Sequence, residues 1–101
     1  MIDVNHKLVL ELKVIIGFRC RKTARLFNGE HVPGLKRQAE KRLRLLDAAN
    51  TLEALQALPS NHFESLSGDR KGQHSIRVNM QWRICFIWHE GAHDVEIVDY
   101  H

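Results

Sequence analysis

The stretch Q-H-S-I-R-V-N-M-Q-W-R-I-C-F-I-W-H, residues 73–89, sets the fold class, because its side chains alternate in character. A period of two predicts β-strands with one buried face. The short connection at 80–81 favours an antiparallel hairpin, and a second one is expected around 90–92. We therefore predict strands at 73–79, 82–89 and 94–100, with Trp82, Phe86 and Trp88 as core anchors.

The chain before this stretch has helical periodicity. Leu35, Ala39, Leu43 and Leu46 fall on one face of a helix predicted over 35–49. Shorter helices are predicted over 19–28 and over 51–58, the latter capped by Asn50 or Thr51, and the apolar run 14–18 is a candidate first strand. Helices followed by strands predict an α+β fold, in which two or three N-terminal helices pack on a small antiparallel β-sheet.

Size and composition indicate one globular domain. The chain has 101 residues, of which 44% are hydrophobic and 27% charged. It contains no apolar run near the roughly 18 residues of a membrane helix, and its start lacks the apolar core of a secretion signal. We expect a cytoplasmic protein with no membrane partner, in which Cys20 and Cys85 are reduced thiols.

Charge is spread unevenly along the chain. Residues 19–44 hold nine cations and two acids, a net +7, whereas residues 45–101 hold four cations and eight acids, a net −4. This asymmetry indicates a polyanionic partner such as nucleic acid, or an acidic protein.

The segment H-E-G-A-H, residues 89–93, matches the zinc signature H-E-x-x-H. That chemistry needs a helix, because only there do the two histidines share one face. Here the segment lies between two predicted strands and contains Gly91, so we predict a polar hairpin loop and no metal or other cofactor.

Metal-independent RNA cleavage needs a group that accepts the 2′-hydroxyl proton, a group that protonates the leaving oxygen, and cations for the phosphorane. An aromatic ring can also hold a base by stacking. The sequence offers Tyr100 and His101 for proton transfer or stacking, with Asp99 to orient a neighbour. Its candidate phosphate ligands are Arg70, Lys71 and Arg83.

Residues 66–86, L-S-G-D-R-K-G-Q-H-S-I-R-V-N-M-Q-W-R-I-C-F, resemble the core motif of HigB-type toxins, which belong to the RelE/ParE superfamily. The ending V-E-I-V-D-Y-H (95–101) is similar to the terminal D-Y-H of that family, and R-L-R-L-L-D-A-A (42–49) to its second helix. The resemblance covers residues 14–101, expected to be one RelE-like toxin domain. Residues 1–13 then are an extension, or Val14 is the true start.

The resemblance implies a microbial RNase-type fold and an endoribonuclease that cleaves mRNA in the ribosomal A site. In that family pattern Arg70 and Arg83 hold phosphate, Tyr100 stacks or polarises, and His101 with Asp99 transfers protons. Basic side chains would bind ribosomal RNA. The residues expected to do so are Arg37, Lys41, Arg44 and Lys71. The implied partners are a HigA-type helix-turn-helix antitoxin and, through it, operator DNA.

This chain departs from the family at two site positions: Glu64 stands where several relatives have an active-site histidine, and Ser67 where they often have lysine. Glu64 remains a candidate base, or His62 could substitute; if both lie on one strand, their side chains face the same way. The structural alternatives are a turn role for Arg70 paired to Asp69, an exposed strand cation at Arg83, and a frayed end at 100–101. The functional alternatives are a gyrase-inhibiting ParE-like toxin and a non-catalytic co-repressor.

Overall fold

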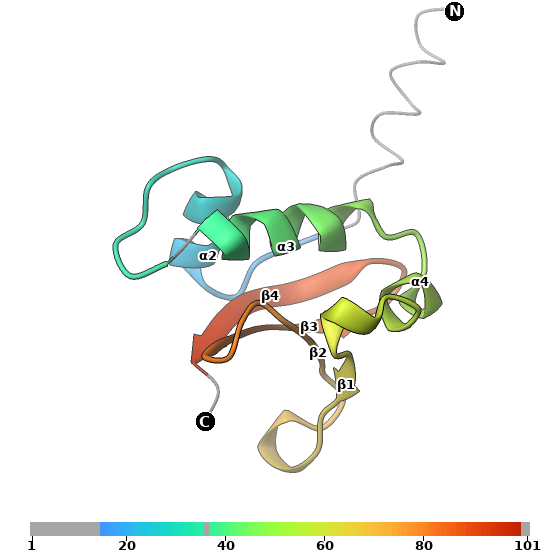
Figure 1. Cartoon of the computed structure of the whole chain (residues 1–101). Coiled ribbons are helices and arrows are strands. Elements are labelled where there is room, and N and C mark those ends of the chain that lie inside the picture. Colours follow the sequence, from blue (N-terminus) through green and yellow to red (C-terminus); the bar gives the residue numbers. More distant parts are fainter. Residues whose placement is uncertain (1–14, 36, 100–101) are drawn as a thin grey trace, which may run out of the picture.

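The computed structural model describes residues 15–35 and 37–99, so the predictions on residues 1–13, Tyr100 and His101 lie outside the described part. The elements along the chain are α2 (Arg21–Phe27), α3 (Arg37–Ala48), α4 (Leu52–Gln56), the 3-10 turn η1 (Pro59–Asn61), β1 (Glu64–Ser65), the 3-10 turn η2 (Gly68–Arg70), β2 (His74–Arg77), β3 (Trp82–Trp88) and β4 (Ala92–Asp99). This order confirms the predicted α+β fold (Figure 1).

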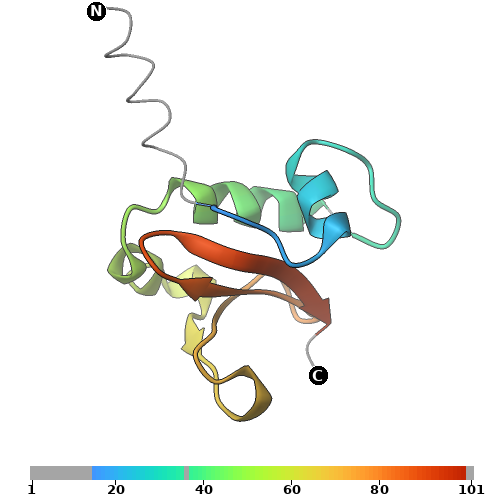
Figure 2. The same ribbon diagram turned by 180° about the vertical axis from the view of Figure 1, so that it is seen from behind.

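The four strands form one sheet in the order β1-β2-β3-β4, with every neighbouring pair antiparallel. Both predicted hairpins are present. β1 was not predicted, because two residues are too few to show a period. The candidate first strand pairs parallel to β4 through isolated bridges at Ile15 and Phe18, and Figure 2 shows this segment running beside β4.

A β-bulge interrupts the pairing of β3 with β4. Cys85 pairs with Glu96 and Ile87 with His93, so Asp94 and Val95 together face the single residue Phe86. Asp94 has a φ of 52°, in the left-handed region that aspartate tolerates better than most residues. The bulge changes which residues of β4 face each side of the sheet.

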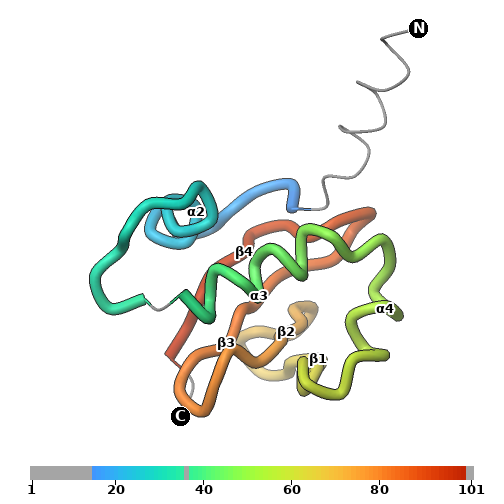
Figure 3. Tube along the Cα trace, turned by 45° about the horizontal axis from the view of Figure 1, so that its top comes forward, coloured from blue at the N-terminus to red at the C-terminus, as the bar shows by residue number. Residues whose placement is uncertain are grey.

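Helix α3 covers one face of the sheet, where it contacts β3 and β4 (Figure 3). Its predicted apolar face is confirmed, since Ala39, Leu43 and Leu46 are buried. Residues from α2, α3, α4 and three strands share one core: Leu26, Val32, Ala39, Leu43, Leu46, Ala49, Leu55, Ile76, Ile84, Phe86, Ala92 and Val95. The loop that carries η2 projects on the other side of the sheet (Figure 1).

The three predicted core anchors differ in burial. Phe86 is fully buried, and Trp88 is half-buried against the core with its ring edge-on to Phe86. Trp82 is wrong as a core anchor: it is half-buried at the end of β3, where it borders a groove beside Thr23 and Ile97.

The ends of α4 follow from local hydrogen bonds. Thr51, one of the two predicted caps, accepts a hydrogen bond from the Ala54 N–H through its hydroxyl oxygen (3.1 Å). After α4, the fully buried Asn61 donates to the Leu55 carbonyl (3.0 Å) and accepts from Arg42 (2.8 Å). These bonds fix the turn from which the chain enters β1.

The H-E-x-x-H segment forms the hairpin between β3 and β4, as predicted. The His89 N–H donates to the Gly91 carbonyl (2.9 Å), and both Glu90 and Gly91 have positive φ. Among the described residues, no three metal-ligating side chains come together, and no helix there is long and apolar enough to cross a membrane. Cys20 and Cys85 are free thiols.

Candidate functional site

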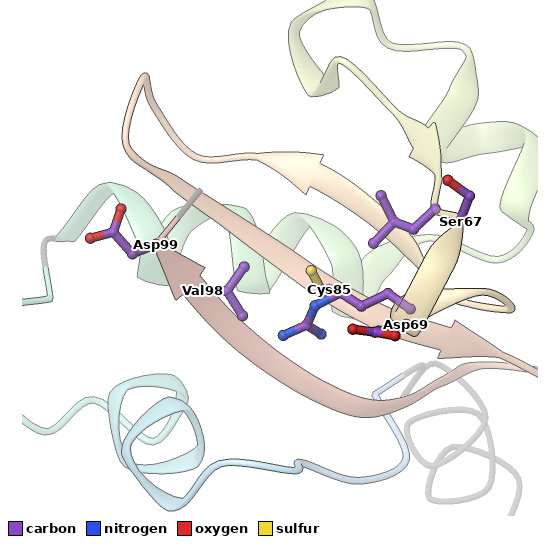
Figure 4. A pocket seen from close by; sticks show the side chains of 7 residues that line it. Ser67, Asp69, Cys85, Val98 and Asp99 are labelled. Atoms are coloured by element: carbon purple, nitrogen blue, oxygen red, sulfur yellow. The ribbon is translucent and has the colours of Figure 1, made fainter. Parts of the chain in front are cut away.

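A cavity of about 360 Å³ opens on the face of the sheet opposite α3. Cys85 and Val98 line it and alternate along their strands with Ile84 and Ile97, which pack toward the core. The loop around η2 supplies the other wall, and Asp99 borders the end (Figure 4). The described residues that line it are Leu66, Ser67, Asp69, Arg70, Cys85, Val98 and Asp99.

Arg70 brings a held positive charge to this cavity. It is the last residue of η2, and its Nη1 donates to Glu96 (3.0 Å) and to Gln73 (2.9 Å). The hydrogen bond with Glu96 raises the pKa of the Arg70 guanidinium, so the group is a permanent cation. Its partner is thus Glu96 and not Asp69, which corrects the alternative pairing considered for this turn. Arg70 keeps 38% of its side chain exposed, and its other N–H groups make no hydrogen bond to a described residue.

Glu96 is a site residue that sequence reasoning missed. Its carboxylate is 18% exposed and accepts from Arg70, and it also lies 4.0 Å from Arg19 Nε. Only the bulge places Glu96 on the cavity face opposite Cys85. The sequence carries no clear signal for that bulge, because Asp94 alone does not predict one.

Arg83 lies on the same face but is buried. Its side chain is 5% exposed, its Nε donates to the Ser75 hydroxyl (2.8 Å) and its Nη2 donates to the His62 carbonyl. Glu64 lies 3.4 Å away as an ion-pair partner. The reading of Arg83 as an exposed strand cation is therefore wrong, and its predicted phosphate contact stays a prediction.

Glu64 and His62 do not lie on one strand, so strand alternation does not turn their side chains the same way, and the choice between them as base stays a prediction. His62 follows η1 with a left-handed φ of 43°, whereas Glu64 begins β1. The Glu64 side chain is half-exposed beside Arg83, and in register Glu64 pairs with Ser75. Its carboxylate neutralises a buried arginine, a role that the sequence alone did not indicate.

Two lining residues shape the chemistry of the cavity. Burial raises the pKa of the Cys85 thiol, so Cys85 forms a neutral wall and not a thiolate. The Asp99 side chain accepts a hydrogen bond from Gln81 (3.2 Å) and points away from Cys85 and Asp69 (Figure 4). Tyr100 and His101 follow Asp99 directly in the sequence, outside the described residues.

The predicted RNA-binding cations lie on α3 and beside η2. Arg37 and Lys41 are exposed on α3, and Lys71 is exposed after η2. Arg44 is exposed but also contacts the protein: its guanidinium lies 4.5 Å from the centroid of the Phe27 ring, donates to the Phe27 carbonyl, and pairs with Glu40 at 3.5 Å. Arg44 therefore joins α2 to α3 as well as adding surface charge.

The α+β fold, with helices on one side of an antiparallel sheet and an arginine-bearing cavity on the other, is consistent with RelE-like toxins. The family model described as "RelE-like toxin of type II toxin-antitoxin system HigB" matches residues 17–101. The chain therefore belongs to the HigB-like toxins. It is similar to Toxin HigB-1 of Vibrio cholerae serotype O1, with 46% identity over 52 residues. That alignment covers 52% of this chain and 55% of the relative, so the chain spans about half the length of the curated relative.

Proposed function

We propose that this toxin is a metal-independent endoribonuclease that cleaves mRNA in the ribosomal A site and so stops translation. The observation that carries the proposal is the geometry of Arg70. Its guanidinium is held by Glu96 and Gln73 at a cavity whose border includes Asp99, and the sequence continues from there into Tyr100 and His101. A fixed cation beside proton-transfer groups is what cleavage of a phosphodiester requires.

In the proposed reaction a base removes the proton of a 2′-hydroxyl, and that oxygen attacks the adjacent phosphorus. A cyclic phosphate forms as the bond from phosphorus to the 5′-oxygen breaks, and an acid protonates the leaving oxygen. Arg70 stabilises the added charge on phosphorus, Tyr100 stacks or polarises, and His101 with Asp99 transfers protons. Glu64 is the alternative base. A phosphate contact by Arg83 would first require Glu64 to release it.

The proposed partners follow from this activity and from family membership. Exposed cations would hold the toxin on ribosomal RNA, a contact that weakens as salt rises. These are Arg37, Lys41, Arg44 and Lys71. A helix-turn-helix antitoxin of the HigA type would neutralise the toxin and carry it to operator DNA. Translating ribosomes place this activity in the cytoplasm.

The test is expression from an inducible promoter without antitoxin, followed by mapping of mRNA 5′ ends. We expect growth arrest with new cuts inside translated reading frames. A chain truncated before Tyr100 should lose these cuts, and the variant Arg70→Ala should make them much slower but still measurable, while both remain folded. Arg25→Ala is the matched control, because Arg25 is an exposed arginine paired only with Glu30 (3.0 Å) among the described residues.

Other outcomes identify the alternatives. Arrest without new cuts in mRNA would contradict the nuclease and favour a gyrase-inhibiting toxin. No arrest at all would favour a co-repressor that acts with its antitoxin. The variant Glu64→Ala addresses the base: unchanged cleavage would exclude Glu64 from proton transfer.

A further inference from the structure

Two arginines from distant parts of the chain share one carboxylate oxygen at the cavity edge. Oε1 of Glu96 lies 3.0 Å from Arg70 Nη1 and 4.0 Å from Arg19 Nε. The two nitrogens are therefore at most 7.0 Å apart, the sum of these distances. Two guanidinium groups and one carboxylate leave a net positive charge within this group, while Asp69 and Asp99 line other parts of the cavity.

The two arginines are held to different degrees. Arg70 is fixed by a short charge-assisted bond and by Gln73. Arg19 is 60% exposed, and its contact with Glu96 is at the outer limit of an ion pair. Exposed ion pairs of this kind contribute little, so Arg19 can turn to another anion at small cost while Arg70 stays in place.

The Arg19 side chain is not needed to hold its own segment on the sheet. The Arg19 backbone N–H donates to the Val95 carbonyl (3.0 Å), and the Val95 N–H donates to the Gly17 carbonyl (3.1 Å). These backbone bonds attach the segment to β4 without the guanidinium. The Arg19 side chain therefore contributes little to holding this segment on the sheet, although it presents a positive charge to solvent.

We propose that Arg19 is a further RNA-binding residue, which takes the phosphate next to the one held by Arg70, and that Glu96 positions both arginines. This inference rests on the proposed function, because it assumes that an RNA strand occupies the cavity. Arg70 is then the fixed contact at the reacting phosphate, and Arg19 is the adjustable contact that sets the path of the strand beyond it.

The binding test uses a short single-stranded RNA with 2′-O-methyl groups, which cannot be cleaved, and the full chain. Affinity is measured over a series of salt concentrations for wild type, Arg19→Ala and Arg25→Ala. Each lost phosphate contact lowers the slope of log affinity against log salt by about 0.7 for single strands. We expect this loss in Arg19→Ala and none in Arg25→Ala, which removes the same charge from α2.

The positioning role of Glu96 is tested by a double-mutant cycle in ribosome-dependent cleavage. Glu96→Ala should lower the cleavage rate at saturating ribosomes several-fold without weakening RNA binding, because a negative charge is removed. In an Arg70→Ala background the same change should have no further effect on the rate. Glu96→Gln, which keeps an oxygen acceptor for Arg70, should recover part of the rate and provides a folded comparison.

Several results would overturn the inference. One is an equal salt slope in Arg19→Ala and wild type, and another is an equal loss in Arg25→Ala. A third is a cleavage rate that Glu96→Ala lowers by the same factor in the Arg70→Ala background as in wild type. A wild-type chain that binds RNA but produces no cuts would instead defeat the proposed nuclease, while the Arg19 contact could still be measured by binding.

Discussion

At the residue scale, Arg70 and Arg83 lie on the same side of the sheet, but 38% of the Arg70 side chain is exposed and only 5% of Arg83. The difference arises from their neighbours. Arg83 is enclosed by the His62 carbonyl, Glu64 and Ser75, whereas the described residues hold Arg70 through one nitrogen, Nη1. Removing Glu64 would take a carboxylate from a buried guanidinium, a more costly loss than removal of a partner from an exposed one.

His74 is a second residue whose surroundings determine its behaviour. Its ring stacks on the Phe63 ring with 5.3 Å between the ring centroids, and the centroid of the Phe86 ring is 5.9 Å away. The His74 Nδ1 lies 3.0 Å from the Ser65 hydroxyl oxygen. Burial lowers the pKa of His74 below its ordinary value of 6.5. The native state therefore binds fewer protons than the unfolded chain in the interval between the two pKa values.

We expect the free energy of unfolding to fall as pH is lowered from above 6.5 through the folded-state pKa of His74. His74→Gln should make this dependence less steep, as measured by urea unfolding at a series of pH values. His31→Gln removes an exposed histidine outside this cluster and serves as the control. A slope unchanged in His74→Gln would contradict the prediction.

The sequence predicted these residues only in part. The period of two indicated which residues of β3 share a face, and the resemblance pointed to Arg70 and Arg83. Neither showed that Arg83 is covered, because that cover comes from the loop after α4, whose path depends on Asn61 and Arg42. Glu96 was missed because its face depends on a one-residue bulge.

At the element scale, α2 depends on its neighbours for stability. It has seven residues and no side-chain N-cap, so it is too short to be stable alone. Leu26 and Thr23 bury one side, and the Thr23 hydroxyl accepts a hydrogen bond from the Ile97 N–H (3.1 Å). Arg44 joins its C-terminal end to α3 through Phe27.

Arg44→Ala should destabilise the protein by about 1 kcal/mol, because the contact combines a cation–π interaction with a hydrogen bond to the Phe27 carbonyl. The loss should be concentrated in α2, where backbone amides would exchange faster with solvent. Arg44→Lys keeps the charge near Glu40 but lacks the planar fork, so it should recover only part of the stability.

Lys41→Ala is the control for this change, because Lys41 is exposed on the same helix and makes no ion pair with a described residue. It should change stability by less than about 0.5 kcal/mol. Equal effects of Arg44→Ala and Lys41→Ala would show that Arg44 contributes only surface charge.

At the scale of the whole molecule, helices and strands share a single core cluster. The order of helices before strands, visible in the sequence, predicted this architecture because each element has one apolar face that must be covered. The parallel pairing of residues 15–18 with β4 was not predictable in the same way, since a short apolar run carries no information on its partner.

One shared core predicts one cooperative transition. Unfolding in urea followed by far-UV circular dichroism, which reports the helices, should have the same midpoint as unfolding followed by fluorescence of Trp82 and Trp88 on β3. Leu43→Ala should move both midpoints together, at a cost of about 2–5 kcal/mol. Separate midpoints would mean that the helical layer unfolds independently of the sheet.

The bulge at Asp94 determines which side chains of β4 face the cavity and which face the core. Without that one extra residue, Val95 would pair with Cys85, and Glu96 would move to the side of Ile84, inside the core. Val95 would take its place on the cavity face, and the cavity would lose the anion that holds Arg70. The number of residues between Ile87 and Asp99 is therefore as much a part of the site as the side chains themselves, and deleting one residue here would be more damaging than most substitutions.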